Sequence, residues 1–88
     1  MSVLTDNEAE EYKIHIFLGN CLIKEAETAL KSGCTFDALS RLKKAIQHFK
    51  DAYLIVANKS STAMTEALVG VNRCEEMIKT IKSKDREK

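Results

Sequence analysis

The sequence of 88 residues contains no proline and no tryptophan, and it has only three glycines. Proline and glycine are the residues that most often interrupt helices, so their scarcity favours long helices. The net charge is only +1, which gives the chain no general attraction to nucleic acid or to acidic membranes. The longest apolar runs, at 16–18 and 52–57, are far too short to span a bilayer. The length suits one small domain with a modest core.

Cysteine is also scarce, with three residues and no Cys-x-x-Cys pair. A secreted disulfide scaffold has an even and denser set, so we expect free thiols in a cytoplasmic protein. The acidic N-terminal segment does not resemble a signal peptide. A structural zinc site needs four clustered ligands, and neither the cysteines nor His15 and His48 have metal-motif spacing. We therefore expect no metal and no cofactor.

Signatures of catalysis are missing as well. The sequence has no nucleophile and base at a diagnostic spacing, no glycine-rich phosphate loop and no His-x-x-x-His pair. His15 falls near the buried arc of the first predicted helix, and His48 at the edge of the second. Each is typical of an ordinary edge or core histidine, and we expect the protein not to be an enzyme.

What the sequence does have is helical spacing of apolar residues, which predicts helices at about 6–32, 35–58 and 61–82. Thr5 and Glu8 form a capping box at the start of the first predicted helix, and Gly33 supplies the cap at its C-terminal end. Thr35 is the predicted N-cap of the second helix, which ends near Asn58. Ser60, Ser61 or Thr62 caps the third.

Each predicted helix carries an apolar stripe. In the first helix it is Leu18, Leu22, Ala26, Ala29 and Leu30, flanked by Tyr12, Ile16 and Ile23. In the second it is Ala38, Leu42, Ala45, Phe49, Ala52 and Val56, and in the third Met64, Ala67, Leu68, Val71, Cys74, Ile78 and Ile81. Gly70, inside the third helix, is either a weak spot or a point where a neighbouring backbone approaches.

Short loops require neighbouring helices to be antiparallel. We therefore predict an all-α fold, an antiparallel three-helix bundle running up-down-up. The expected domain organisation is an N-terminal extension at 1–5, the bundle at 6–82 and a polar C-terminal tail at 83–88 that frays beyond Ile81.

Several apolar residues are left over from these stripes. On the first helix, Ile14, Phe17 and Cys21 share a side; this helix either packs against both others or presents the stripe to a partner or a second copy. Leu54 and Ile55 lie outside the second stripe, and Phe36 is expected to fold back over Leu30 or Leu39. On the third helix, Val69 is an apolar spot ringed by polar residues.

Between Ala26 and Lys79 the chain resembles an MIT domain, the microtubule-interacting and trafficking module. The similar segments are the helix-turn-helix at 29–39, with Gly33 five residues before Ala38, the continuation at 44–49, and Asn72-Arg73-Cys74-Glu75-Glu76-Met77. The last is similar to the Arg-Ala-Glu-x-Leu signature of the family's third helix. The first two segments are shared with tetratricopeptide repeats, which are the second choice.

The MIT resemblance implies a non-enzymatic adaptor in endosomal trafficking that binds helical or linear motifs, chiefly ESCRT-III tails, in grooves beside the third helix. By position, the matching residues are Val71, Asn72, Glu75 and Met77, with Glu75 pairing with a ligand cation. If the binding residues are instead chosen only because they point away from the apolar stripe of the third helix, they are Val69, Arg73 and Glu76.

The expected partner is thus a protein, not nucleic acid, with any membrane contact indirect. The expected location is the cytoplasm, with an association with endosomes implied by the resemblance. The alternative is a helical assembly subunit that forms homo- or hetero-oligomers through Ile14, Phe17 and Cys21 of the first helix.

Overall fold

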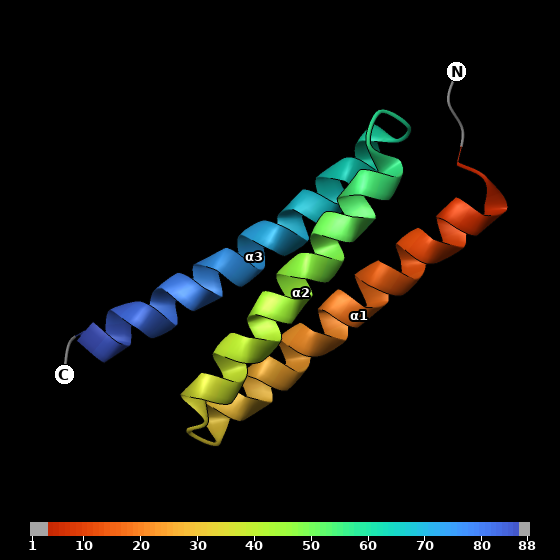
Figure 1. Cartoon of the computed structure of the whole chain (residues 1–88). Coiled ribbons are helices and arrows are strands. Elements are labelled where there is room, and N and C mark those ends of the chain that lie inside the picture. Colours follow the sequence, from red (N-terminus) through yellow and green to blue (C-terminus); the bar gives the residue numbers. More distant parts are fainter. Residues whose placement is uncertain (1–3, 87–88) are drawn as a thin grey trace.

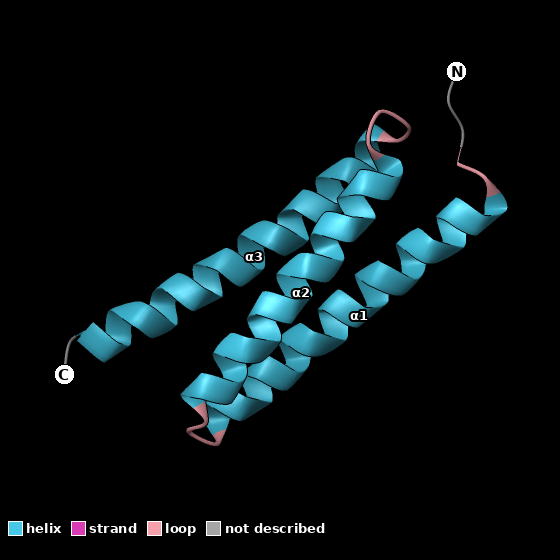
Figure 2. Ribbon diagram, in the orientation of Figure 1, coloured by secondary structure: helices cyan, strands magenta, loops and turns pink. Residues whose placement is uncertain are grey.

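The computed structural model describes the backbone of residues 4–86 and the side chains of residues 4–84. In this range it has three helices and no strand: α1 (Asp6–Lys31), α2 (Thr35–Val56) and α3 (Ser61–Arg86) (Figure 2). Two tight turns reverse the chain, so α2 runs antiparallel to both neighbours (Figure 1). The predicted all-α, up-down-up bundle is confirmed. Residues 1–3 of the predicted extension and 87–88 of the predicted tail lie outside the described residues.

The ends of α1 follow the predicted capping chemistry. The Thr5 hydroxyl accepts a hydrogen bond from the Glu8 amide at 3.1 Å, and the Glu8 carboxylate accepts one from the Thr5 amide at 3.0 Å. At the other end Gly33 has a φ of 81°, and the Cys34 amide donates to the Ala29 carbonyl at 2.8 Å. A left-handed residue at this point satisfies carbonyls that the helix leaves open, so both caps are confirmed.

The turn between α2 and α3 is also as predicted in kind, although α2 ends at Val56 rather than near residue 58. Asn58 has a φ of 64°, and the Ser60 hydroxyl accepts a hydrogen bond from the Ala63 amide at 3.2 Å. Asparagine tolerates this left-handed geometry better than most residues. Of the three candidate caps for α3, Ser60 is therefore the one in use.

Two predicted boundaries are wrong. The N-cap of α2 is Cys34 rather than Thr35, and its side chain makes no capping hydrogen bond. The tail was expected to fray beyond Ile81, but α3 continues to Arg86. Lysine and arginine are good helix formers, and positive charge is favourable near a helix C-terminus.

The middle helix holds the bundle together. α2 packs along both neighbours, whereas α1 and α3 approach each other at only a few positions. Buried alanines of α1 (Ala26, Ala29) and α2 (Ala38, Ala45) share one core cluster, and such small side chains let two helices approach closely. The result is an elongated molecule with extents of 53 × 18 × 14 Å.

Phe49 of α2 is the largest of the fully buried side chains, with 1% of its surface exposed. Its ring lies against two glycines: a Cβ added at Gly19 of α1 would stand 2.6 Å from Phe49 Cζ, and one at Gly70 of α3 would stand 2.5 Å from Phe49 Cδ1. The reason for Gly70 is thus a close approach, but of an aromatic side chain rather than of a backbone. One ring connects all three described helices.

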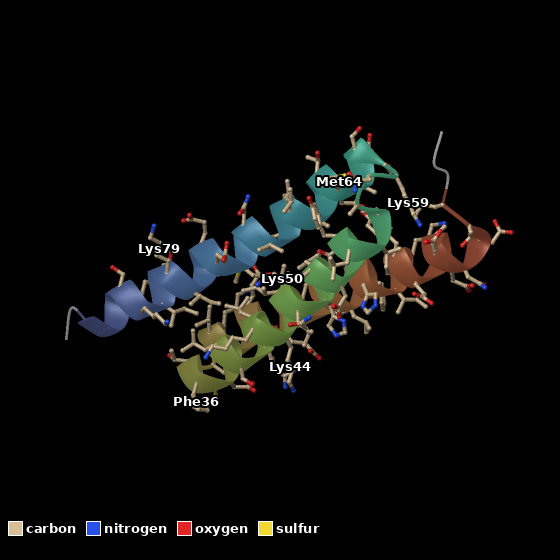
Figure 3. The ribbon with its side chains drawn as sticks, turned by 45° about the horizontal axis from the view of Figure 1, so that its top comes forward. Phe36, Lys44, Lys50, Lys59, Met64 and Lys79 are labelled. Atoms are coloured by element: carbon tan, nitrogen blue, oxygen red, sulfur yellow. The ribbon has the colours of Figure 1, made fainter. Side chains whose placement is uncertain are left out.

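The predicted stripes identify most of the core but misplace its edges. Tyr12 and Ile23, placed on the flank of the first stripe, are buried, whereas Leu18 is exposed. Leu68, placed in the third stripe, is 47% exposed. The prediction that Phe36 folds back over Leu30 or Leu39 is wrong, since it projects from the first turn of α2 with 88% of its surface exposed (Figure 3).

Candidate functional site

Two hollows lie between α2 and α3, of about 280 Å³ and about 410 Å³. Their lining residues recur every three or four positions along both helices, so the hollows follow one another along the same seam. The first is lined by Lys50, Tyr53, Leu54, Leu68 and Val71, and the second by Lys43, Ile46, Glu75, Ile78, Lys79 and Lys82. We call these eleven residues the α2–α3 groove.

The floor of this groove is apolar and its rim is positively charged. Leu54 and Leu68 are 72% and 47% exposed, which is unusual for leucines that face each other across a helix pair. Four lysines and a single glutamate, Glu75, supply the charges. Such a surface fits a segment that has apolar anchors on one side and carboxylates beside them.

A third hollow, of about 390 Å³, lies on the other side of α3 near its C-terminal end. We call it the C-terminal cleft; its lining residues are Leu30, Thr35, Glu76, Met77, Thr80, Ile81 and Lys84. It therefore joins the end of α1 and the start of α2 to the last turns of α3.

The predicted partner-binding residues of the third helix do not form one site. Val71 and Glu75 line the α2–α3 groove, whereas Glu76 and Met77 line the C-terminal cleft. The other three predicted residues are exposed on α3 and line neither hollow: Val69, Asn72 and Arg73. Positions chosen by family resemblance and positions chosen by outward direction are thus spread over different faces of α3.

The leftover stripe of α1 remains uncovered. Ile14 and Phe17 are 50% and 66% exposed, and Cys21 is half-buried. Because α1 meets α3 at only a few positions, packing between these two helices does not cover the stripe.

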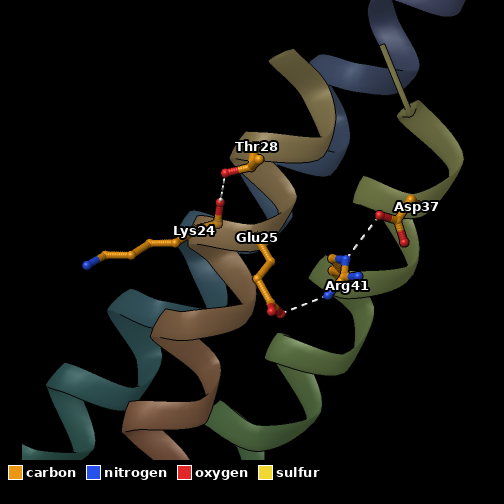
Figure 4. A network of polar contacts seen from close by, with 5 residues as sticks. All are labelled: Lys24, Glu25, Thr28, Asp37 and Arg41. Carbon is orange, nitrogen blue, oxygen red and sulfur yellow. Dashed lines mark hydrogen bonds and ion pairs between the residues drawn. The ribbon is translucent and has the colours of Figure 1, made fainter. Parts of the chain in front are cut away.

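A polar hollow between α1 and α2 is occupied by its own ion pairs. Arg41 of α2 donates to Glu25 of α1 at 2.8 Å and to Asp37 at 3.1 Å (Figure 4). These two carboxylates raise the pKa of the Arg41 guanidinium, Asp37 contributing more. Since the guanidinium is already engaged, this hollow is a poor candidate for binding an anionic ligand.

Two polar contacts far apart in the sequence join α1 to the start of α3. The single proton of the Tyr12 hydroxyl is shared in a bifurcated hydrogen bond between the Ala63 carbonyl, at 3.2 Å, and the Glu66 carboxylate. Burial of the hydroxyl, and next its hydrogen bond to Glu66, raise the pKa of Tyr12. Lys59 lies in the turn that precedes α3 (Figure 3), and its ammonium group donates to the Glu8 carboxylate of α1. No helical spacing reveals such pairs, because they depend on which faces meet.

The two histidines, which sequence reasoning treated separately, are in contact. His15 Nδ1 of α1 lies 3.1 Å from His48 Nδ1 of α2. Asp51, one turn after His48, completes a group whose ligand atoms lie within 4.8 Å of one another. The only sequence signal for this group is the three-residue spacing of His48 and Asp51 on α2, which does not indicate that His15 of α1 joins them.

Cys74 can be set aside as a nucleophile. It is fully buried in the core, and burial raises the pKa of its thiol to about 11. Cys34 is exposed and Cys21 half-buried, and all three thiols are free.

In the described part of the chain, α1, α2 and α3 all lack an apolar stretch sufficient to traverse a bilayer. No protein-family model, curated protein or solved structure matches this chain. The class that the fold defines is a small all-α bundle.

Proposed function

We propose that this chain is a non-enzymatic protein-interaction module that binds a short amphipathic helix or linear motif of a partner protein in the α2–α3 groove. The observation that carries the proposal is the groove itself, with an exposed apolar floor beside four lysines. Helix-in-groove recognition uses anchors spaced by three and four residues, which fill such a floor. The lysine rim favours motifs with aspartate or glutamate beside the anchors.

The resemblance to MIT domains extends the proposal to a class of partner. It favours ESCRT-III-type tails and a role in endosomal trafficking in the cytoplasm, with membranes reached only through the partner. The resemblance had assigned Glu75 to a ligand cation. Because Glu75 shares its hollow with Lys43, Lys79 and Lys82, we expect acidic residues of the ligand to contribute more than basic ones.

The test is peptide binding measured by fluorescence anisotropy. The panel contains ESCRT-III-type tails, a designed acidic amphipathic helix, the same helix with its carboxylates changed to amides, and an extended proline-containing peptide. We expect the acidic helix to bind and the amide version to bind more weakly, with a steep loss of affinity as salt is added. Failure of every peptide at up to about 1 mM, with the protein folded, would overturn the proposal. Preference for the extended peptide would favour the tetratricopeptide-like alternative.

Neighbouring residues provide matched variants. Leu68 and Val69 are both exposed apolar residues of α3, 47% and 58%, but only Leu68 lines the groove. Leu68→Asp should weaken binding at least about tenfold, while Val69→Asp should change it little. The opposite result would move the site to the outward face of α3.

The lysines allow a second comparison. Lys50 lies on the side of α2 that faces α3, and Lys44 lies on the opposite side (Figure 3). Lys50→Glu should weaken binding of the acidic helix by about tenfold, whereas Lys44→Glu should leave it nearly unchanged.

A second candidate function rests on the exposed stripe of α1. Ile14 and Phe17 present contiguous apolar surface next to the half-buried Cys21, and such surface is typical of association. In this case the chain is an assembly subunit, with a second copy or a helix of a different protein packed against α1. Sedimentation at increasing concentration tests it: a dimer that Phe17→Ser abolishes supports self-association, and a monomer at all concentrations removes it.

A further inference from the structure

The His15–His48 contact joins the two helices that pack most closely. His15 lies on α1 and His48 on α2, and both side chains are half-buried. Their ring centroids are 5.3 Å apart with the planes tilted by 36°, so the rings meet through their nitrogens rather than by stacking. The 3.1 Å between the two Nδ1 atoms is a hydrogen-bond distance, in which one ring nitrogen donates and the other accepts.

The distance between these nitrogens is also close to that between two nitrogens bound to the same metal ion. In tetrahedral zinc coordination each Zn–N bond is about 2.0–2.1 Å, which places two ligating nitrogens about 3.3 Å apart. The observed 3.1 Å differs from this by only tenths of an ångström. The two histidine nitrogens therefore already stand at nearly the separation of two ligands of one zinc ion.

Asp51 supplies a third ligand of suitable chemistry. One of its carboxylate oxygens lies within 4.8 Å of the histidine nitrogens, and it is half-buried on the same side of α2. Its other role is as acceptor of a hydrogen bond from Gln47 Nε2 at 3.0 Å. Outer partners of this kind orient a ligating carboxylate and are common around metal sites.

We propose that His15, His48 and Asp51 form a binding site for a divalent transition-metal ion, with Zn²⁺ the best match. Two imidazoles and a carboxylate are a donor set that zinc accepts, with water or a side chain of a partner in the fourth position. Because the ligands come from both α1 and α2, the bound ion ties the hairpin together. The site lies apart from the α2–α3 groove and does not depend on the proposed peptide binding.

The primary test is isothermal titration of the full chain with ZnCl₂ at about pH 7.5, where imidazole nitrogens are available to metal. We expect one ion per chain, and binding weakened at least about tenfold by His48→Gln and by Asp51→Asn. Cys34→Ser is the control, because the exposed Cys34 thiol is the other group that zinc would choose. Absence of binding at up to about 1 mM Zn²⁺ overturns the proposal, as does binding that only Cys34→Ser removes.

A spectroscopic readout distinguishes this geometry from adventitious binding. Because the two rings meet at their Nδ1 atoms, we expect zinc to bind through these two nitrogens. In ¹⁵N–¹H correlation spectra of the imidazole rings, zinc should shift Nδ1 of both histidines together, and Nε2 should become the protonated nitrogen. Coordination through Nε2, or a shift of only one histidine, would contradict the site. Circular dichroism of the substituted proteins confirms that they remain folded.

Discussion

Replacing either glycine beside Phe49 tests the packing of the bundle directly. In an ordinary helix interior, glycine to alanine stabilises by about 1 kcal/mol. At Gly19 and Gly70 the new methyl group would stand 2.6 Å and 2.5 Å from atoms of the Phe49 ring, about 1 Å inside normal carbon–carbon contact. The ring cannot simply move away, because Cε1 is among the nearest atoms to both glycines; relief at one side brings it closer to the other.

Overpacking of a well-filled core costs about 1–3 kcal/mol. After subtraction of the gain in helix propensity, we expect Gly70→Ala to lower the free energy of unfolding by about 1 kcal/mol. In urea, where small proteins have m-values of about 1 kcal/mol/M, the midpoint should fall by about 1 M. Gly19→Ala should behave in the same way.

The matched control is Asn72→Ala on the exposed side of α3, where only helix propensity acts and a small stabilisation is expected. The Phe49→Leu background supplies the second control. With the ring removed, Gly70→Ala should become neutral or stabilising, giving a coupling energy of about 1–3 kcal/mol in the double-mutant cycle. A stabilised Gly70→Ala protein with no coupling to Phe49 would refute the reasoning.

Three further predictions concern single side chains. Cys34 should react with a maleimide within the dead time of labelling by mass spectrometry, whereas Cys74, buried and with its pKa raised to about 11 by that burial, should react only on unfolding; equal rates would contradict its placement. The hydrogen bond from Lys59, and next that from the Thr5 amide, lower the pKa of Glu8 below its ordinary 4.5. Ionised Glu8 therefore stabilises the folded state above about pH 4.5, and this contribution is lost as the pH falls through the lowered pKa. Wild-type protein should therefore lose more thermal stability than Glu8→Gln between about pH 6 and pH 3, and parallel curves would contradict this. Tyr12→Phe removes the hydroxyl that contacts Ala63 and Glu66, and it should lower the free energy of unfolding in urea by about 0.5–1.5 kcal/mol. An unchanged free energy of unfolding would instead indicate that this hydroxyl is bonded to water.

Both ends of α1 and the turn between α2 and α3 were predictable because their signals are local. The Thr5–Glu8 capping box, the left-handed Gly33 and the left-handed Asn58 each act within four residues of themselves, so they operate in the same way wherever the helix packs. The continuation of α3 to Arg86 was missed because polar composition was taken as a sign of fraying, although lysine and arginine have high helix propensity.

The faces of the helices were harder to predict. An apolar arc is broader than the contact it makes, and only the position of the neighbouring helix decides which edge is covered. Leu18 and Leu68 lie at such edges and are exposed, while Tyr12 is buried under the start of α3. For the same reason Glu75 and Glu76, adjacent in sequence, belong to different hollows.

The histidine cluster shows the limit of spacing arguments most clearly. His48 and Asp51 are three residues apart on α2, which a sequence search can detect. His15 joins them only because the register of α1 against α2 places it opposite, and that register depends on the fit of the alanines between the two helices. A pair of residues 33 positions apart cannot be recognised without it.

The central position of α2 has a kinetic consequence. Each helix packs mainly on the helix next to it in the chain, so the bundle can form by two successive hairpin closures over turns of a few residues. Such local closures lose little chain entropy, and proteins dominated by them fold within microseconds to milliseconds. The same topology attaches α3 mainly to α2, so we expect local opening of α3 to cost less free energy than separation of α1 from α2.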